Sequence, residues 1–441
     1  MTKEPAPSPA RMGRYIAAVT LGNALEFYDF LTYSFFAIQI GRCFFPSTSG
    51  YGSLMASLAT FGAGFATRPL GAIAIGHYAD RVGRRPAMLL SFMLIGVSII
   101  GMALIPPYQS IGFMAPVLFV SARLLQGFSL GGEIGSNTAF LVEAAMEEMR
   151  GFIVSFQGAS QMASALTGSA VGAVLSVLLS PDALTSYGWR IAFTLGGLVV
   201  PIGWWLRRSL PETLTAHTRT AEPIASRARL ARSHWRVMVL GLVILGMGTI
   251  GAYVQMYIVT FAQHVMHLSA HAGFLASCAN SMAAIPALLL GGWLSDRFGR
   301  RPVNVVGNAL LLVLVVPLFA VAVDSGSAAT FVVSMSVLGF VSNLTFGVVC
   351  AALGEGLPRT IRASAFGTVY SIAMAFFGGS SEFVVTWLIH ISASPMAPAW
   401  YVAGATAVAQ VALMFLPESA PVRVRRSPTA VNAKAPFRMR N

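Results

Sequence analysis

Gly76 to Pro86 reads G-H-Y-A-D-R-V-G-R-R-P, and the pattern returns at Gly292 to Pro302 as G-W-L-S-D-R-F-G-R-R-P. Each copy is a short charged turn between two long apolar stretches, and Gly83 and Gly299 allow each turn to be tight. The repeat predicts two homologous halves, each with the same turn at one membrane surface. The main architecture with such a duplication is a pair of helical bundles that rock against each other around a central site.

The composition excludes a soluble protein. Hydrophobic residues make up 56% of the 441 residues and charged residues only 10%, and the mean hydropathy is +0.70. Because a membrane-spanning helix needs about 20 mainly apolar residues, we predict an all-α membrane protein of twelve transmembrane helices in two six-helix halves. The expected spans are 15–40, 52–76, 87–106, 112–142, 151–179 and 190–206 in the first half, and 237–263, 271–294, 303–323, 329–354, 363–391 and 399–416 in the second.

The expected domain order follows from these spans. The chain begins with a cytoplasmic arm and ends with a basic tail that we expect to be disordered. The segments are the arm at 1–14, the first half at 15–206, a cytoplasmic linker rich in arginine at 207–236, the second half at 237–416, and the tail at 417–441.

The basic residues predict the orientation in the membrane. An even number of spans places both termini on one side, and most of the 29 Lys and Arg residues fall on that side, so we expect both termini in the cytoplasm. The opposite side carries only Arg42 and Arg190. The net charge of +13 therefore reflects topology and does not call for nucleic-acid binding. We expect a bacterial inner-membrane protein without a cleavable signal peptide, because the first apolar segment itself contains acidic residues.

The repeated turns predict a gate at the cytoplasmic surface. Their aspartates can accept backbone N–H bonds or cap a helix, and their arginines need anions nearby. Glu143 and Arg150 after the fourth span are echoed by Glu355 and Arg362 after the tenth. We expect Arg84 or Arg85 to pair with Glu143. In the second half we expect Arg300 or Arg301 to pair with Glu355. Binding of the arginines to anionic lipid is the alternative. The predicted gate consists of Asp80, Arg81, Arg84, Arg85, Glu143, Asp296, Arg297, Arg300, Arg301 and Glu355.

These turns resemble the loop signature of the major facilitator superfamily. R-L-L-Q-G-F-S-L-G-G-E at Arg123 to Glu133 and E-F-Y-D-F at Glu26 to Phe30 resemble its metabolite:proton symporter family. S-F-Q-G-A-S-Q at Ser155 to Gln161 resembles bacterial citrate and tricarballylate symporters. The resemblance covers nearly the whole chain except the tail. It implies proton-coupled symport of a small organic acid, such as citrate or tricarballylate, into the cytoplasm by alternating access.

Four polar residues share one face of the first span. Asn23, Glu26, Asp29 and Tyr33 are spaced three or four residues apart, which is the helical repeat. A carboxylate in a bilayer is costly unless it faces a cavity or a partner, and one that alternates between burial and an arginine partner binds and releases a proton. We therefore predict proton coupling by Glu26 or Asp29. A fixed pair that holds two helices together is the alternative.

Arg123 is the best candidate for binding a carboxylate substrate, because a guanidinium binds a carboxylate through two parallel hydrogen bonds. Gln126 lies one turn further on and points the same way, and three glycines at four-residue spacing from Gly127 form a ridge that lets another helix approach. Glu133 lies about 15 Å along the axis from Arg123, so it is a proton-coupling candidate and not a direct partner. Arg68 is the other basic residue within a span, and its role is structural or functional.

Polar residues in the fifth span and in the second half complete the candidate site. Gln157 and Gln161 share a helix face and suit hydrogen bonds to carboxylate or hydroxyl groups, with polar packing between helices as the alternative. The predicted substrate site consists of Arg123, Gln126, Gln157, Gln161, Tyr33, Tyr253 and Asn280. The predicted proton-coupling residues are Glu26, Asp29, Glu133 and Glu382.

Other kinds of site are disfavoured. His264, His267 and His271 lie near the outer ends of the seventh and eighth spans, but Leu268 and Ser269 predict a turn among them, so we favour interfacial packing over a metal site. Nothing resembles a nucleophile with its base or a phosphate-binding glycine loop. We therefore expect no enzyme, no ATP-driven pump, no metal and no cofactor.

The expected partners are a small organic acid, protons and the lipid bilayer, without nucleic acid, and we expect a functional monomer. Three alternatives stay open. The first is another cargo, such as a dicarboxylate, an aromatic acid or a zwitterionic osmolyte. The second is a proton-driven exporter, and the third is a membrane receptor that transports nothing.

Overall fold

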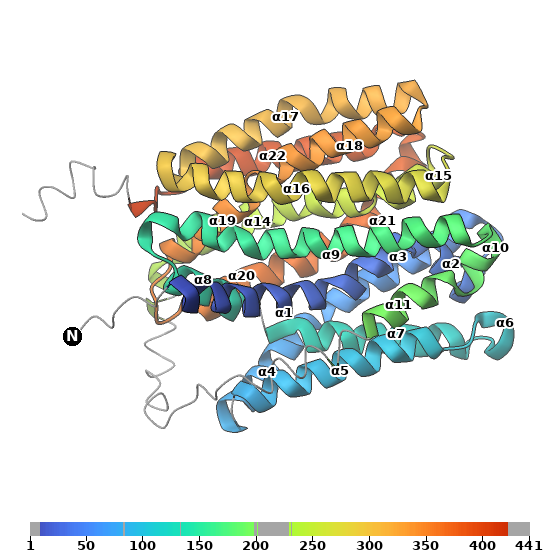
Figure 1. The fold of residues 1–441 in the computed structure, drawn as a ribbon, viewed down its shortest axis with the longest axis horizontal. Coiled ribbons are helices and arrows are strands. Elements are labelled where there is room, and N and C mark those ends of the chain that lie inside the picture. Colours follow the sequence, from blue (N-terminus) through green and yellow to red (C-terminus); the bar gives the residue numbers. More distant parts are fainter. Residues whose placement is uncertain are drawn as a thin grey trace, which may run out of the picture.

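The computed structural model describes residues 9–82, 84–132, 134–197, 201, 229–230 and 232–421. Every regular element in these residues is a helix, and the helices lie side by side in one elongated bundle (Figure 1). The predicted linker and tail fall mostly outside the described residues.

The first half is a series of long helices joined by short ones. Its elements are α1 (Pro9–Phe35), α2 (Ala37–Phe44), α3 (Gly50–Ala66), α4 (Arg68–Val82), α5 (Arg84–Leu104), α6 (Tyr108–Ile111), α7 (Met114–Ser129), η1 (Leu130–Gly132), α8 (Ile134–Ala144), η2 (Glu147–Met149), α9 (Arg150–Leu178), α10 (Pro181–Ala183), η3 (Leu184–Gly188) and α11 (Trp189–Gly197).

The second half repeats the pattern. Its elements are α14 (Trp235–Met256), α15 (Ile258–His264), α16 (Ala270–Phe298), α17 (Arg300–Ser325), α18 (Ala328–Asn343), α19 (Phe346–Gly356), α20 (Arg362–Ala373), η5 (Met374–Gly378), α21 (Gly379–Ser392) and α22 (Ala397–Phe415).

As far as the chain is described, each expected apolar span falls on one helix or on consecutive helices of this series. The span expected at 15–40, for example, consists of α1 and α2 with a break at Phe36. α1 begins at Pro9, ahead of the expected membrane span. Proline fits this position, since its missing N–H would have no partner in the first helical turn.

Two predicted turns are confirmed. Gly299 joins α16 to α17 with a positive φ of 103°, a conformation that glycine adopts without a steric penalty. At the other end of α16, Ser269 caps the helix by accepting a 3.2 Å hydrogen bond from Ala272 N. The turn predicted at Leu268 and Ser269 therefore separates α15, which ends at His264, from α16.

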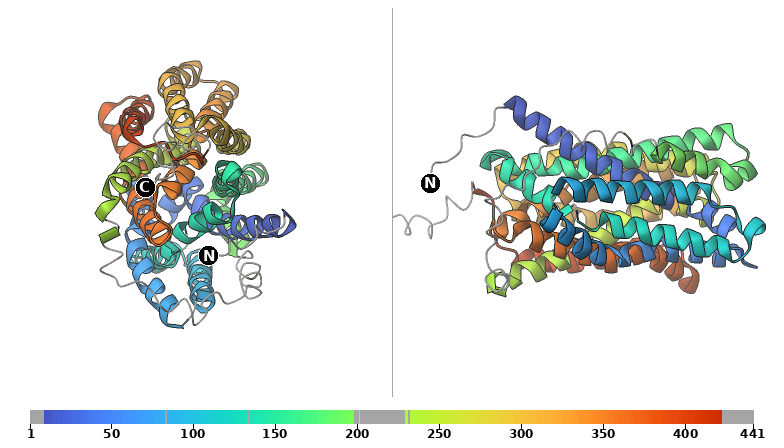
Figure 2. Two further views of the ribbon diagram at one scale, coloured as in Figure 1. Left: turned by 90° about the vertical axis from the view of Figure 1, so that its left-hand side faces the viewer. Right: turned by 90° about the horizontal axis from the view of Figure 1, so that it is seen from below.

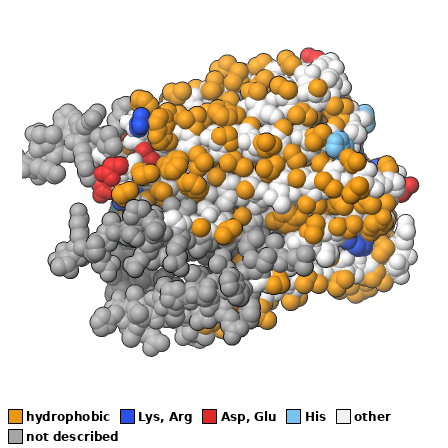
Figure 3. All heavy atoms as spheres, in the orientation of Figure 1, with side chains coloured by type: hydrophobic (Ala, Val, Ile, Leu, Met, Phe, Trp, Pro, Cys, Tyr) orange, Lys and Arg blue, Asp and Glu red, His pale blue; other side chains and the backbone are white. Residues whose placement is uncertain are grey.

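The surface of the bundle is that of a multi-pass membrane protein. In the described residues, eight helical stretches are long and apolar enough to cross a membrane, and shorter apolar helices lie at Leu89–Leu104 and Met114–Ser129. Figure 3 shows a broad apolar surface between two ends near which charged and histidine side chains gather. This is the distribution expected when a bilayer surrounds the middle of the bundle.

The two halves meet most extensively along α9 and α16, which lie side by side in Figure 1. Glycine permits this approach, because a β-carbon on Gly151 would lie 2.7 Å from the Gly292 carbonyl oxygen, and one on Gly292 would lie 2.5 Å from the Gly151 carbonyl oxygen. Further contacts between the halves join α8 to α20 and α3 to α21. These helices position the residues described below.

The bundle has two chemically different ends. α1 begins and α22 ends at the same end (Figures 1 and 2), which we call the terminal end; it contains Glu143, Arg300 and Glu355. The opposite end contains Tyr51 and His264, and we call it the distal end.

Candidate functional site

Arg123 on α7 lies within a cluster of aromatic rings. Its side chain is 1% exposed, and its guanidinium carbon lies 4.7, 4.5 and 4.9 Å from the ring centroids of Phe30, Tyr33 and Phe61. It also donates a hydrogen bond to the side-chain oxygen of Gln126. Because cation–π contacts strengthen to about 2 kcal/mol or more when water is excluded, these rings stabilise a buried cation. The structure thus brings three predicted substrate residues together.

Glycines set the position of α7 against α3 and α4. A β-carbon on Gly64 would lie 3.1 Å from Arg123 Nε, Gly127 abuts the backbone of Gly64, and Gly131 abuts the backbone at the start of α4. The predicted ridge is therefore confirmed for its first two glycines, and the third lies outside the described side chains. The ridge places the guanidinium against the rings of α1 and α3.

Arg68 is a second buried cation beside the same rings. Its guanidinium carbon lies 5.1 Å from the ring centroid of Phe30 and 4.6 Å from that of Phe65. Tyr253 of α14 joins the cluster from the second half, with its ring centroid 5.6 Å from Phe65 and 6.0 Å from Phe61. The cluster therefore lies on the interface between the halves and includes a fourth predicted substrate residue.

Glu382 on α21 is fully buried near this cluster. Its Oε1 accepts a 2.5 Å hydrogen bond from Ser34 Oγ on α1, which links the two halves. Its Oε2 has no hydrogen-bond partner among the described residues, and Arg123 is close enough to interact with the carboxyl electrostatically. A buried carboxyl in a membrane protein is expensive when charged and marks a functional position by default. Glu382 therefore has the surroundings that a proton-coupling residue requires.

Seven predicted residues lie outside the described side chains, so their roles stay predictions. They are Glu26, Asp29 and Glu133 of the proton-coupling set and Asp80, Arg81, Arg84 and Arg85 of the gate.

Gln157 links α9 to α8 and α1. Its Oε1 accepts a 2.8 Å hydrogen bond from Thr138 Oγ1, and its backbone carbonyl accepts a 3.0 Å bond from Asn23 Nδ2. Asn23 Nδ2 also donates to Ser160 Oγ at 2.8 Å. These bonds are the helix packing that the sequence left open as the alternative for this glutamine.

Gln161 and Asn280 differ in what surrounds them. Each has a buried polar atom, Nε2 and Oδ1 respectively, without a hydrogen-bond partner in the described part of the chain. Asn280 lies against Gly339, because a β-carbon added to Gly339 would lie only 2.8 Å from Asn280 Cγ. Asn280 therefore packs between α16 and α18 within the second half, and no described contact brings it to Arg123.

At the terminal end, the turn between α16 and α17 connects the halves. Asp296 Oδ1 and Oδ2 accept hydrogen bonds of 2.8 and 2.9 Å from the backbone N–H groups of Gly151 and Phe152. These are N–H groups of the first turn of α9, which have no partner within the helix. The carboxylate also faces the positive end of the helix dipole. An acid of the second half thus caps a helix of the first.

Arg300 binds two carboxylates at once and is 1% exposed. One guanidinium nitrogen lies 2.7 Å from Asp296 Oδ1, while Nε and the other terminal nitrogen donate to the two oxygens of Glu355 at 3.1 and 3.0 Å. The second contact is the bidentate arrangement that gives an arginine–carboxylate pair its strength. Of the two arginines expected near Glu355, Arg300 is the partner.

Glu143 pairs across the interface with Arg362 on α20. The nitrogen–oxygen distance is 2.9 Å, and the Glu143 side chain is 42% exposed. The partner that the structure gives Glu143 is therefore in the other half, whereas the expected Arg84 and Arg85 lie outside the described side chains.

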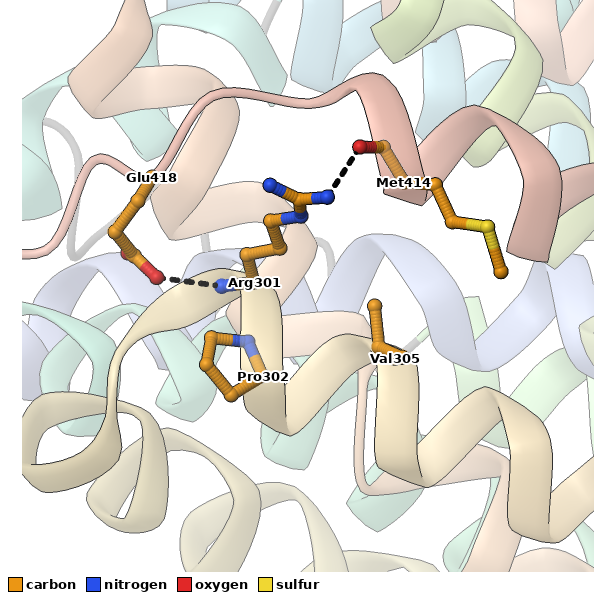
Figure 4. Close-up of a pocket in the computed structure, with 5 residues that line it drawn as sticks. All are labelled: Arg301, Pro302, Val305, Met414 and Glu418. Atoms are coloured by element: carbon orange, nitrogen blue, oxygen red, sulfur yellow. Dashed lines mark hydrogen bonds between the residues drawn. The ribbon is translucent and has the colours of Figure 1, made fainter.

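Arg297 and Arg301 make their described contacts within the second half. Arg297 is exposed, with its guanidinium carbon 4.0 Å from the ring centroid of Trp293. Figure 4 shows that Arg301 donates through its side chain to the Met414 carbonyl and through its backbone N–H to Glu418, at 3.1 Å. These bonds fasten α17 to α22 and do not cross between the halves.

Sequence reasoning missed Ser34 and the pairing of Arg362. A serine beside aromatic residues has no distinctive pattern, and its partner Glu382 is 348 residues away. A signal for Arg362 was present, because Arg362 occupies the position equivalent to Arg150 in the repeat. Equivalent positions do not, however, predict that Arg362 pairs with Glu143 of the other half.

Similar proteins identify the family. The Major Facilitator Superfamily profile matches residues 12–285 and 270–439. The chain is 36% identical over 413 residues to a citrate-proton symporter of Klebsiella pneumoniae, covering 92% of both chains. It is 34% identical to the alpha-ketoglutarate permease of Escherichia coli (strain K12), covering 91% of this chain and 93% of that one. It is 30% identical to the proline/betaine transporter of the same organism, covering 93% and 84%.

The chain therefore belongs to the Major Facilitator Superfamily, and its predicted resemblance to citrate-proton symporters is confirmed. Among solved structures, it is similar to a proton:xylose symporter of this superfamily bound to 6-bromo-6-deoxy-D-glucose, with a TM-score of 0.75 and 17% identity over 93% of this chain and 97% of that one. At this identity the likeness concerns the fold, and it confirms the predicted all-helical superfamily fold.

Proposed function

We propose that the protein is a proton-coupled symporter that imports a small organic acid, with a tricarboxylate such as citrate as the first candidate. The observation that carries this proposal is that Arg123 of one half and Glu382 of the other are both buried near the interface, close enough to interact electrostatically. The guanidinium suits a carboxylate ligand, and the carboxyl suits a transported proton.

The cycle we infer follows from these charges. A proton from outside forms an O–H bond on Glu382, which removes the negative charge that competes for Arg123. The guanidinium then binds a carboxylate of the substrate. When the terminal end opens, the anion leaves and the carboxyl releases its proton on that side. Because the protein is an ensemble of states closed at one end or the other, binding needs only to shift their populations.

The topology is part of the proposal. We place the terminal end in the cytoplasm because the basic loops gather there by the positive-inside rule, and we propose twelve spans, a bacterial inner membrane and a functional monomer. The contacts that Asp296 and Glu143 make between the halves support a state closed toward the cytoplasm.

A different cargo is the main alternative. The alpha-ketoglutarate permease and the proline/betaine transporter are also relatives, which favours a dicarboxylate or a zwitterionic osmolyte as second candidates. The aromatic rings that would hold a quaternary ammonium already face two guanidiniums, Arg68 and Arg123. A cationic ligand would be repelled there, so the site favours the anion.

A ligand screen followed by transport tests the proposal. Purified protein is heated with citrate, tricarballylate, 2-oxoglutarate or betaine, since a ligand stabilises the state it binds. The stabilising compound is then measured for uptake into proteoliposomes with an imposed inward proton gradient, with and without a protonophore. We expect citrate or tricarballylate to stabilise most and to accumulate only with the gradient. Stabilisation by betaine alone would contradict the cargo, and accumulation that survives the protonophore would contradict proton coupling.

A further inference from the structure

A pocket opens at the distal end, near Glu382. Its volume is about 410 Å³, and residues lining it include Tyr51, Tyr257, His264, Thr386 and His390. Tyr51 belongs to α3 of the first half and stacks on His390 of α21, with ring centroids 4.0 Å apart and an interplanar angle of 18°. The pocket therefore spans both halves, at the end opposite the ion pairs of Arg300.

Two buried hydroxyls form part of the pocket lining. Thr386 Oγ1 lies 2.9 Å from the Tyr257 hydroxyl and 2.8 Å from the backbone carbonyl of Glu382. Because a hydroxyl carries one hydrogen, a Thr386 that donates to the carbonyl accepts from Tyr257. In this arrangement the donors run from Tyr257 through Thr386 to the backbone carbonyl of Glu382, one turn from the Glu382 carboxyl.

The carboxyl lies within one helical turn of this pair. Glu382 precedes Thr386 by four residues on α21, which is about 6 Å along the axis, and the Tyr257 hydroxyl interacts with it electrostatically. The carboxyl oxygen Oε2 is buried and has no hydrogen-bond partner in the described residues. It is therefore the atom on Glu382 that is free to receive a proton.

We propose that the distal pocket and the Tyr257–Thr386 hydroxyl pair are the route by which protons reach Glu382 from the distal side. This route rests on the proton coupling proposed above. A ring nitrogen of His390 or His264 releases a proton toward the hydroxyl pair, and each hydroxyl passes on one proton as it receives another. One water molecule can span the remaining turn. An N–H bond breaks on the protonated imidazole, which becomes neutral, and an O–H bond forms on the carboxylate. Hydronium from the distal side then protonates the imidazole again and leaves water.

The charges around the two ends of the route suit this direction. Glu382 interacts with groups from three other elements, namely Tyr33, Arg123, Tyr253 and Tyr257. His264 faces Arg42 of α2 and His267 of the turn before α16. Burial, with smaller contributions from His267 and Arg42, lowers the pKa of His264 below its ordinary value of about 6.5. A lowered pKa means that the protonated imidazole gives up its proton more readily.

The test separates proton movement from substrate movement in proteoliposomes loaded with the full chain. Radiolabelled citrate is followed in two modes, uptake driven by an inward proton gradient and counterflow at equal pH, which needs no net proton transfer. We expect Thr386→Val and Tyr257→Phe to slow proton-driven uptake on the order of a hundredfold, the lower end of the range for loss of a proton-transfer group, and to leave counterflow largely intact. Thr386→Ser keeps the hydroxyl and should restore uptake.

Thr368→Val is the matched control, because Thr368 is an exposed threonine of α20 whose hydroxyl bonds only its own helix. Equal losses in both modes would assign the hydroxyls to substrate binding or packing and overturn the route. Wild-type rates in both modes would mean that protons take another path and would overturn it too. If wild-type protein accumulates no citrate, the proposed function fails and the route with it. Tyr257→Phe, which keeps the ring, decides the question should Thr386→Val fail to fold.

Discussion

The two ends of the interface between the halves are held by different chemistry. At the terminal end, Asp296 of the second half caps α9 of the first and is held in place by the buried Arg300, and breaking one partner out of a buried pair costs about 3–5 kcal/mol. At the distal end, the contacts between the halves include the stacked rings of Tyr51 and His390, worth about 0.5–1.5 kcal/mol, and a 3.3 Å contact of Ser176 with His271. From this difference we expect the distal end to open more easily and to admit ligands and protons.

Removing Arg300 is the strongest way to break this asymmetry. Arg300→Ala leaves two buried carboxylates without their cation, at a cost of about 3–5 kcal/mol. Because one of them, Asp296, caps α9 of the other half, part of this cost should weaken closure of the terminal end. Cys350 is buried on α19, which contacts α9 of the other half. Its maleimide labelling, in protein whose Cys43 and Cys278 are replaced by serine, should therefore become faster.

Arg297→Ala is the matched control, since Arg297 is exposed and contacts Trp293 in its own half. If Arg300→Ala and Arg297→Ala label alike, the ion pairs do not close the terminal end, and the contrast between the ends fails.

Arg123 should show the next largest effect, because in the proposed cycle both ends give access to it in turn. Arg123→Lys keeps the charge but loses the planar fork and the ring contacts, so citrate binding should weaken by about 1–3 kcal/mol, the range of a charge-assisted bond. Arg123→Ala should weaken it more. The citrate-induced thermal shift measures both. A wild-type shift in Arg123→Ala would show that this residue only supports the fold.

The fold was largely predictable because it depends on local patterns. Runs of apolar residues predicted the positions of the long helices, the repeated turn predicted two halves, and Gly299 predicted the tight turn between α16 and α17. Each of these signals lies within one short segment of sequence. α1 starts at Pro9, before the apolar run, because polar residues can extend a helix beyond its apolar part.

The site was less predictable because its contacts are set by how the halves dock. Arg123, Gln126 and Tyr33 meet within the first half, where helix periodicity and the glycine ridge are informative. The bonds of Ser34 to Glu382 and of Asp296 to α9 join residues far apart in sequence. No pattern in a single sequence predicts these contacts between the halves, since they depend on how two complete helical bundles pack together.

Glu143 offers a smaller test at the terminal end. Its pair with Arg362 is partly solvated, so Glu143→Gln should favour opening by only about 1 kcal/mol or less. A double-mutant cycle with Arg362→Gln isolates the pair, and Glu148→Gln, an exposed acid of η2, is the control. The rate of Cys350 labelling by maleimide again measures the opening of the terminal end. An effect as large as that of Arg300→Ala would mean that exposure does not set the strength of these contacts.

The smallest effect should appear at the distal end, as a difference in how acid affects stability. Because the pKa of His264 is lowered in the folded protein, the unfolded chain binds this proton more tightly, so stability present above pH about 6.5 is lost as pH falls through the folded pKa. His264→Asn removes that loss and should reduce the fall in Tm between pH about 7.5 and about 5.5 by about 1 to 2 °C. His234→Asn, at the terminal end, is the matched substitution. If both variants lose as much Tm as the wild type on acidification, the distal histidine does not respond to pH in the folded state, and the pH sensitivity that we assign to the distal end would have to come from other groups.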